Sequence, residues 1–284
     1  MQKLFIIVLG FCSLFTTAQT LDNSLLWKIS GNDLGKPSYI YGTIHITCDA
    51  TLDKNILNAL DATSQLYLEL DADDPNMQTE MMGDLMMKDG KKISTMLNES
   101  DYKLVSDFVN ANAGMPLSMM DTMKPFIVSA MLYPGMLDCP MQSFETQLMK
   151  ISHQQNEDIY GLETVQQQMA VFDTISYEEQ AQELIKMAKD GIEKSKSQFK
   201  EMMDTYSRKD LNGLMKIMND AENPMYSKHN DILLVNRNNN WIPKIEKAMK
   251  EKPTFFGVGA AHLAGANGVI NLLRKKGYKV EAVK

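Results

Sequence analysis

The sequence is poor in several residues and patterns that mark whole classes of proteins. It has three cysteines, and none of them forms a Cys-x-x-Cys pair, so a zinc–thiolate site is not expected. Beyond the N-terminal stretch there is no run of about 20 apolar residues, so no membrane span is expected in the mature chain. Lys and Arg number 29 against 36 Asp and Glu. This acidic balance argues against binding to nucleic acid or anionic lipid.

The N-terminus has the composition of a secretory signal. Lys3 supplies its one cation, residues 4–15 are apolar, and small residues follow as far as Ala18. We therefore expect residues 1–18 to be a signal peptide and residues 19–284 to form one exported domain, periplasmic or secreted.

Only two cysteines, Cys48 and Cys139, would remain after cleavage of the signal. An oxidising compartment would permit them to pair. Two buried thiols fit the sequence equally well, so the pattern leaves the pairing open.

Strand-like segments open and close the chain around a long helical middle. We predict strands at residues 25–30, 38–42, 65–71, 158–163, 254–258 and 278–283. Residues 74–150 and 177–250 have mostly helical spacing, which predicts a large helical insertion. The expected fold is α/β, with a pseudo-symmetric mixed central β-sheet and flanking helices.

Two similar phrases place a histidine just beyond a predicted strand. One Gly-x-x-His phrase ends at His45 and the other at His262. A glycine at that position would let the backbone turn tightly, and strand ends of this kind form sites in open sheets. We therefore expect both imidazoles in one site, although two ordinary turns with structural histidines remain the alternative. His153 and His229 lack this setting and are expected to be structural or exposed.

Two acidic residues, Glu69 and Glu163, lie near the carboxyl ends of predicted strands. Imidazoles and carboxylates on separate loops are the usual ligands of catalytic divalent metals. We therefore expect His45, His262, Glu69 and Glu163 to hold a metal such as manganese, cobalt, zinc or iron, among which the sequence does not choose. A spare carboxylate could act as a general base. The alternative is that the acids cap helices or pair with lysines.

Arg237 stands in a predicted helix around residues 229–250. Its fork of donors could hold a substrate carboxylate or a developing oxyanion. The alternative is an ordinary cation on the surface of a helix.

Short motifs along the whole mature chain resemble the TraB/GumN family. They are Leu26 to Ile29, Pro37 to His45, Gly161 to Thr164, Arg237-Asn238 and Val258 to Gly265, and their order and spacing are specific. The family includes the Tiki metalloproteases, which need manganese or cobalt, and its fold is similar to that of erythromycin esterases.

The resemblance also implies roles for individual residues. It pairs His45 with His262, makes Glu69 and Glu163 the site acids, and adds Arg237 with Asn238 to the catalytic set. Glu145 is a secondary candidate only, because Ser143-Phe144-Glu145 stands where many relatives have Gly-x-Asp.

Three functions are compatible with this sequence. The first is a metal-dependent peptidase or related hydrolase that acts on peptides, or on a small polar substrate, in the cell envelope. The second is a metal-independent, esterase-like hydrolase in which His45 is the general base. The third is a non-catalytic protein that binds a peptide, haem or iron.

Overall fold

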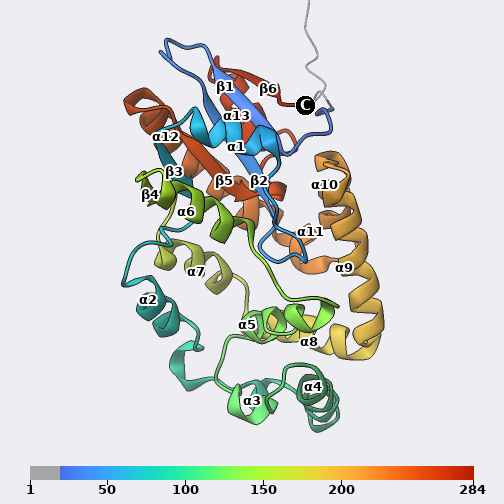
Figure 1. Cartoon of the computed structure of the whole chain (residues 1–284). Helices are drawn as coiled ribbons and strands as arrows, with labels where there is room; N and C mark the ends of the chain where they lie inside the picture. Colours follow the sequence, from blue (N-terminus) through green and yellow to red (C-terminus); the bar gives the residue numbers. More distant parts are fainter. Residues whose placement is uncertain (1–19) are drawn as a thin grey trace, which may run out of the picture.

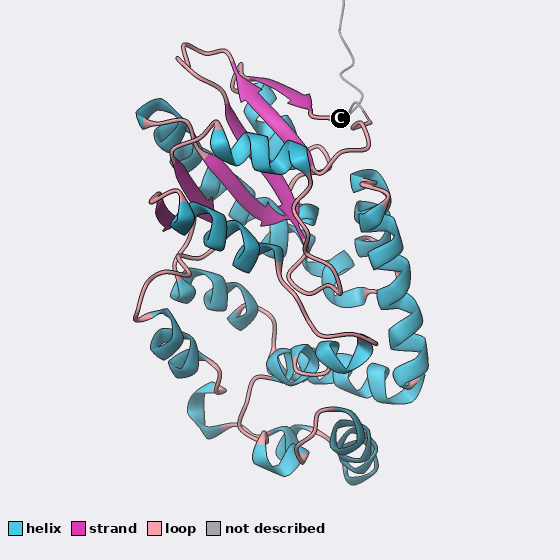
Figure 2. Ribbon diagram, viewed as in Figure 1, coloured by secondary structure: helices cyan, strands magenta, loops and turns pink. Residues whose placement is uncertain are grey.

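Six strands form one mixed sheet, which confirms the predicted α/β class (Figures 1 and 2). The computed structural model describes residues 20–284, so the predicted signal peptide lies outside the described residues. The strands are β1 (Leu26–Ser30), β2 (Ser38–Thr43), β3 (Gln65–Leu68), β4 (Asp158–Gly161), β5 (Phe255–Gly259) and β6 (Lys279–Ala282). Their spatial order is β4-β3-β5-β2-β1-β6.

The centre of the sheet joins the beginning of the domain to its end. Strands β2 and β5 pair in parallel, with Thr43 opposite Gly259, and β3 and β4 continue in the same direction. Strand β1 is antiparallel to both β2 and β6. Both Gly-x-x-His phrases therefore leave the sheet at the same edge.

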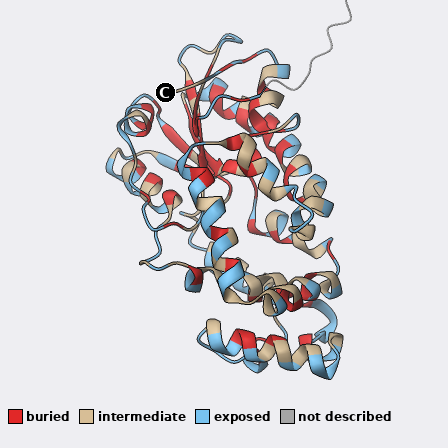
Figure 3. Ribbon diagram, turned by 90° about the vertical axis from the view of Figure 1, so that its right-hand side faces the viewer, coloured by how far each residue is buried: buried red, intermediate tan, exposed pale blue. Residues whose placement is uncertain are grey.

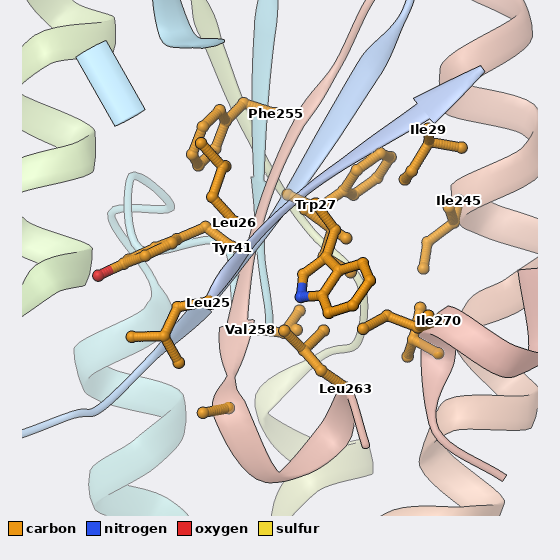
Figure 4. Packing of buried hydrophobic residues seen from close by; sticks show 14 of the residues in the cluster. Leu25, Leu26, Trp27, Ile29, Tyr41, Ile245, Phe255, Val258, Leu263 and Ile270 are labelled. Carbon is orange, nitrogen blue, oxygen red and sulfur yellow. The ribbon is translucent and has the colours of Figure 1, made fainter. Parts of the chain in front are cut away.

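Helices cover both faces of the sheet. In Figure 1, α1 (Lys54–Asp61) and α6 (Phe144–Gln154) lie in front, and α13 (Val269–Lys275) lies behind. Figure 4 shows Trp27 with Ile245 and Ile270 on one side, while Tyr41 points to the other. All four side chains are buried. Because both faces are covered, the central strands are apolar rather than alternating.

Helix α12 (Asn236–Glu251) also packs against the sheet, with Trp241 and Ile245 in its core. The remaining helices lie mainly beyond the carboxyl edge of the parallel strands (Figure 1). They are α2 (Met77–Asp84), α3 (Ile93–Met96), α4 (Glu99–Asn112), α5 (Pro125–Ala130), α7 (Val165–Asp173), α8 (Tyr177–Asp190), α9 (Ile192–Ser207), α10 (Leu211–Met218) and α11 (Pro224–Asn230). A π-helical turn at Asp231–Val235 leads directly into α12. Among residues 20–284, no helix is both long and apolar enough to cross a membrane.

Some of these helices pack around a second hydrophobic core, which is distinct from the core of the sheet. We call the segment from α3 to α5, with α8 and α9, the helical lobe. Its centre includes Val105, Leu117 and Leu184, none of which is exposed to solvent. Figure 3 shows these buried positions as a group apart from those around the sheet. The long α9 connects the two regions, because Phe199 packs in the lobe and Tyr206 in the core of the sheet.

His45 lies where the chain passes from one core to the other. Ile44 packs against the core of the sheet and Ile46 against that of the helical lobe. Shortly afterwards, Cys48 forms a disulfide with Cys139, which answers the question that the sequence left open. The loop after β2 is thereby joined to the segment that begins α6.

Candidate functional site

The predicted site residues come together at the carboxyl edge of the parallel strands. They are His45 after β2, His262 after β5, Glu69 after β3, Glu163 after β4, and Arg237 and Asn238 at the start of α12. A Cβ atom built on Gly259 would lie 3.2 Å from Glu69 Oε1, 3.6 Å from His262 Cδ2 and 3.8 Å from His45 Nε2. The two histidines and Glu69 therefore surround one point.

The glycines of the two Gly-x-x-His motifs allow neighbouring atoms to pack closely against the backbone. Gly42 lies within β2 and Gly259 is the last residue of β5, and neither has positive φ, so neither position requires the conformational freedom of glycine for a turn. A Cβ atom on Gly42 would lie 3.0 Å from Ala260 Cα, so this glycine lets the two phrases pack together. Gly259 leaves room for the side chains of the site.

His262 is held in one orientation by Asn238. The amide nitrogen of Asn238 donates to the carbonyl oxygens of His262 (3.3 Å) and Asn267 (2.9 Å). Its Oδ1 therefore faces His262 Nδ1, at 2.6 Å, and we assign the proton to Nδ1 from this contact. The unprotonated Nε2 then points to Arg237 Nη1, 3.0 Å away. Burial lowers the pKa of His262 to about 3, so its imidazole is neutral.

His45 is held in a similar way by a carboxylate. Its Nδ1 lies 2.9 Å from Glu145 Oε1, and its imidazole is 67% exposed. The hydrogen bond to Glu145 raises the pKa of His45 to about 9. Because the imidazole is exposed, water partly screens its attraction to Glu145. With Nδ1 occupied by Glu145, Nε2 is the atom that faces Glu69 and His262.

Glu145 is the site residue that sequence reasoning ranked too low. Besides His45 it accepts hydrogen bonds from Thr43 Oγ1 (2.7 Å) and Ser143 Oγ (2.6 Å). Burial by itself raises the pKa of Glu145, but its contacts with His45, Ser143 and Thr43 lower it to about 2. The N-cap position of Ser143 was readable from the sequence, but the contact with His45 is long-range and left no local signal.

Arg237 is an interior counter-ion, so the alternative of a cation on a helix surface is wrong. Its side chain is 11% exposed and makes ion pairs with Glu69 and Glu163. Two further side chains complete this cluster. Gln168 Nε2 donates to both carboxylates at 3.2 and 3.1 Å, and Trp241 Nε1 donates to Glu163 Oε2 at 3.2 Å.

Glu69 is buried yet ionised. Burial by itself raises the pKa of Glu69, but the groups around it lower that pKa to about 2: His262, Arg237, His45 and the N–H of Gly259. The Gly259 N–H donates to Glu69 Oε1 at 2.8 Å. Because burial keeps His262 neutral, we attribute the lowering mainly to Arg237 and the Gly259 N–H.

The two remaining histidines lie in other contacts. His153 pairs with Asp73 at 2.8 Å and His229 with Glu179 at 3.0 Å. Neither contact involves a residue of the site.

The donors suit a divalent metal in kind and in orientation. Both imidazoles have Nδ1 against an oxygen acceptor and Nε2 directed into the site, as metal-ligating histidines usually do. The spacing is a different matter, since no three His, Cys, Asp or Glu side chains within residues 20–284 form a group that could hold a metal. In this structure His262 Nε2 is in contact with Arg237 Nη1 instead. Arg237 and Gln168 bind Glu69 as well as Glu163, and Glu163 has a further donor in Trp241. A metal could use His45, His262 and Glu69 once the contacts of Arg237 with His262 and Glu69 open.

Comparison with known proteins confirms the resemblance seen in the sequence. Two proteins named metalloprotease TIKI2 are similar to this chain. The one from Danio rerio is 20% identical over 91% of this chain and 61% of its own length, and the one from Xenopus tropicalis is 21% identical over 96% and 62%. The chain thus spans about three fifths of these relatives. No solved structure matches it. The TraB/PrgY/gumN family profile matches residues 25–282, and the chain belongs to this family.

Proposed function

We propose that this protein is a hydrolase that cleaves peptides outside the cytoplasm, with a divalent metal held by His45, His262 and Glu69. One observation carries the proposal. Two histidines from opposite ends of the chain present Nε2 beside an ionised Glu69, around the space that Gly259 leaves open. The name metalloprotease, carried by the two relatives, supports a peptide substrate.

The metal would polarise a scissile carbonyl group as a Lewis acid. The residues of the chain supply the rest. Glu145 keeps His45 Nδ1 occupied, so His45 presents only Nε2. Glu163 and Trp241 keep Arg237 at the site. The N–H groups of Arg237 already donate to Glu69, Glu163, His262 and the Leu233 carbonyl, so it could bind a carboxylate or a developing negative charge on oxygen only in exchange for one of these contacts.

The location outside the cytoplasm rests on two features of the chain. The N-terminal composition is that of a secretory signal. The Cys48–Cys139 disulfide is of a kind that persists in oxidising compartments.

A peptide-library digestion with the mature chain tests the proposal. We expect cleavage that a chelator abolishes and that manganese, cobalt or zinc restores. His45→Ala and His262→Ala should each abolish cleavage and leave the circular dichroism spectrum unchanged. His153→Ala is the matched control, because His153 is a histidine outside the site, and it should cleave normally. Stoichiometric peptide binding without turnover would contradict a hydrolase.

A second candidate is a metal-independent hydrolase, and the His45–Glu145 pair favours it. An exposed imidazole backed by a half-buried carboxylate can exchange a proton with water or with a leaving group. In that case cleavage would need His45 and Glu145 but would continue at full rate in the presence of a chelator.

A further inference from the structure

The Cys48–Cys139 disulfide lies beside the candidate site rather than in a remote part of the fold. Cys48 follows His45 by three positions, and Cys139 precedes Glu145 by six. Between the two cysteines the chain runs through α1, β3 and then α2 to α5. The disulfide therefore fixes two segments against each other that the sequence places far apart.

Hydrogen bonds join the same two segments. Thr47 and Gln142 form an isolated antiparallel bridge, with N–H···O contacts of 3.0 and 2.8 Å. The Gln142 side chain donates to Cys48 O at 2.9 Å and accepts from the Ala50 N–H at 3.2 Å. We call the disulfide and these contacts the clamp.

The clamp ends where the site begins. Residue Gln142 is followed by Ser143, the N-cap of α6, and then by Glu145, whose carboxylate meets His45 Nδ1 at 2.9 Å. His45 itself stands outside any regular element, and its imidazole is largely exposed. Packing alone therefore does little to orient the ring.

We propose that Glu145 is a positioning residue for His45 and that the clamp holds Glu145 in place beside it. The clamp sets the start of α6 against the loop after β2, Thr43 and Ser143 orient the Glu145 carboxylate, and Glu145 turns His45 Nε2 into the site. The disulfide thereby acts on the chemistry of the site as well as on stability. This inference rests on the proposed function, because it concerns the orientation of a residue proposed to bind the metal.

Titration of the mature protein with Co²⁺, followed by its visible absorption, tests the inference without relying on activity. We expect Glu145→Ala to weaken Co²⁺ binding about 10- to 100-fold, the usual effect of losing such a partner of a ligand. Glu145→Gln should restore part of that loss, because its amide oxygen can still accept from Nδ1. The double variant Cys48→Ser/Cys139→Ser should weaken binding about tenfold, and Gln142→Ala should change it in the same direction.

Double-mutant coupling separates positioning from a general loss of stability. If the clamp acts through Glu145, removing the disulfide from Glu145→Ala should weaken Co²⁺ binding by less than about threefold more. Leu273→Ala is the control for stability, because Leu273 is buried in α13, outside both segments of the clamp. It should lower the melting temperature and leave Co²⁺ affinity unchanged.

Two results would overturn the inference. One is a Cys48→Ser/Cys139→Ser variant that melts earlier but binds Co²⁺ as tightly as the parent. The other is a disulfide effect that is just as large in the Glu145→Ala background. If the proposed function itself is wrong, His45→Ala should bind Co²⁺ as tightly as the parent, a result that distinguishes the two failures.

Discussion

Replacement of Arg237 by alanine is the perturbation whose size the structure predicts most directly. Arg237 pairs with two carboxylates whose side chains are only 9% and 6% exposed. Without the guanidinium group, Glu69 and Glu163 would face each other across the site with only Gln168 shared between them. Removing one partner from a buried ion pair typically costs about 3–5 kcal/mol. For a domain of this size, that corresponds to a fall in melting temperature of roughly 10 °C.

The pH dependence of the stability loss distinguishes a buried carboxylate without a counter-ion from a simple loss of packing. In the variant, Glu69 and Glu163 lack their counter-ion. We expect the folded-state pKa of such a buried carboxyl group to lie above its value in the unfolded chain. The penalty is then complete above the raised pKa and disappears as pH falls through it, at about 1.4 kcal/mol for each pKa unit. In the parent, the pKa of Glu69 is lowered to about 2, so Glu69 is charged both at about pH 5 and at about pH 8. The variant should therefore lose clearly more stability at about pH 8 than at about pH 5.

Urea unfolding of parent and variant at both pH values measures this difference. Arg274→Ala is the matched control, because Arg274 donates to the Val280 carbonyl and lies over Trp27 without binding a carboxylate. Its cost should be nearly independent of pH. An equal loss of stability at the two pH values in Arg237→Ala would refute the assignment of Arg237 as an interior counter-ion.

Three further changes give distinct outcomes. Gly42→Ala should destabilise the fold by about 1–3 kcal/mol in chemical denaturation, because its Cβ would lie 2.9 Å from Leu263 Cδ1; an unchanged midpoint would contradict the close packing of the two phrases. Gly259→Ala should instead reduce peptide cleavage at least tenfold with a smaller loss of stability, since its Cβ would enter the site beside Glu69; unaltered cleavage would argue against the shared site. Cys48→Ser/Cys139→Ser should cost about 4–5 kcal/mol on the chain-entropy account, because the disulfide spans 91 positions; calorimetry that shows no loss would rule out this contribution.

Local patterns were enough to predict the elements that carry the site. The apolar runs before His45 and His262 were recognised as strands, and the structure pairs them as β2 and β5. Glu69 and Glu163 were located for the same reason, because each follows a short apolar strand.

Contacts between distant segments could not be predicted in this way. The hydrogen bond of Glu145 to His45 spans 100 positions, and the contacts of Gln168 with both carboxylates depend on how α7 meets the sheet. Nor does the pattern around Arg237 reveal its burial, since a charged residue in a helix is more often exposed. The role of Gly42 and Gly259 was misjudged because close approach depends on the neighbouring segment, which the local sequence does not reveal.

The metal content of the purified mature chain tests the central claim most directly. The convergence of His45, His262 and Glu69 predicts about one bound manganese, cobalt or zinc ion for each parent chain. The double variant His45→Ala/His262→Ala should fold and hold none. Equal metal content in the two proteins would contradict the account.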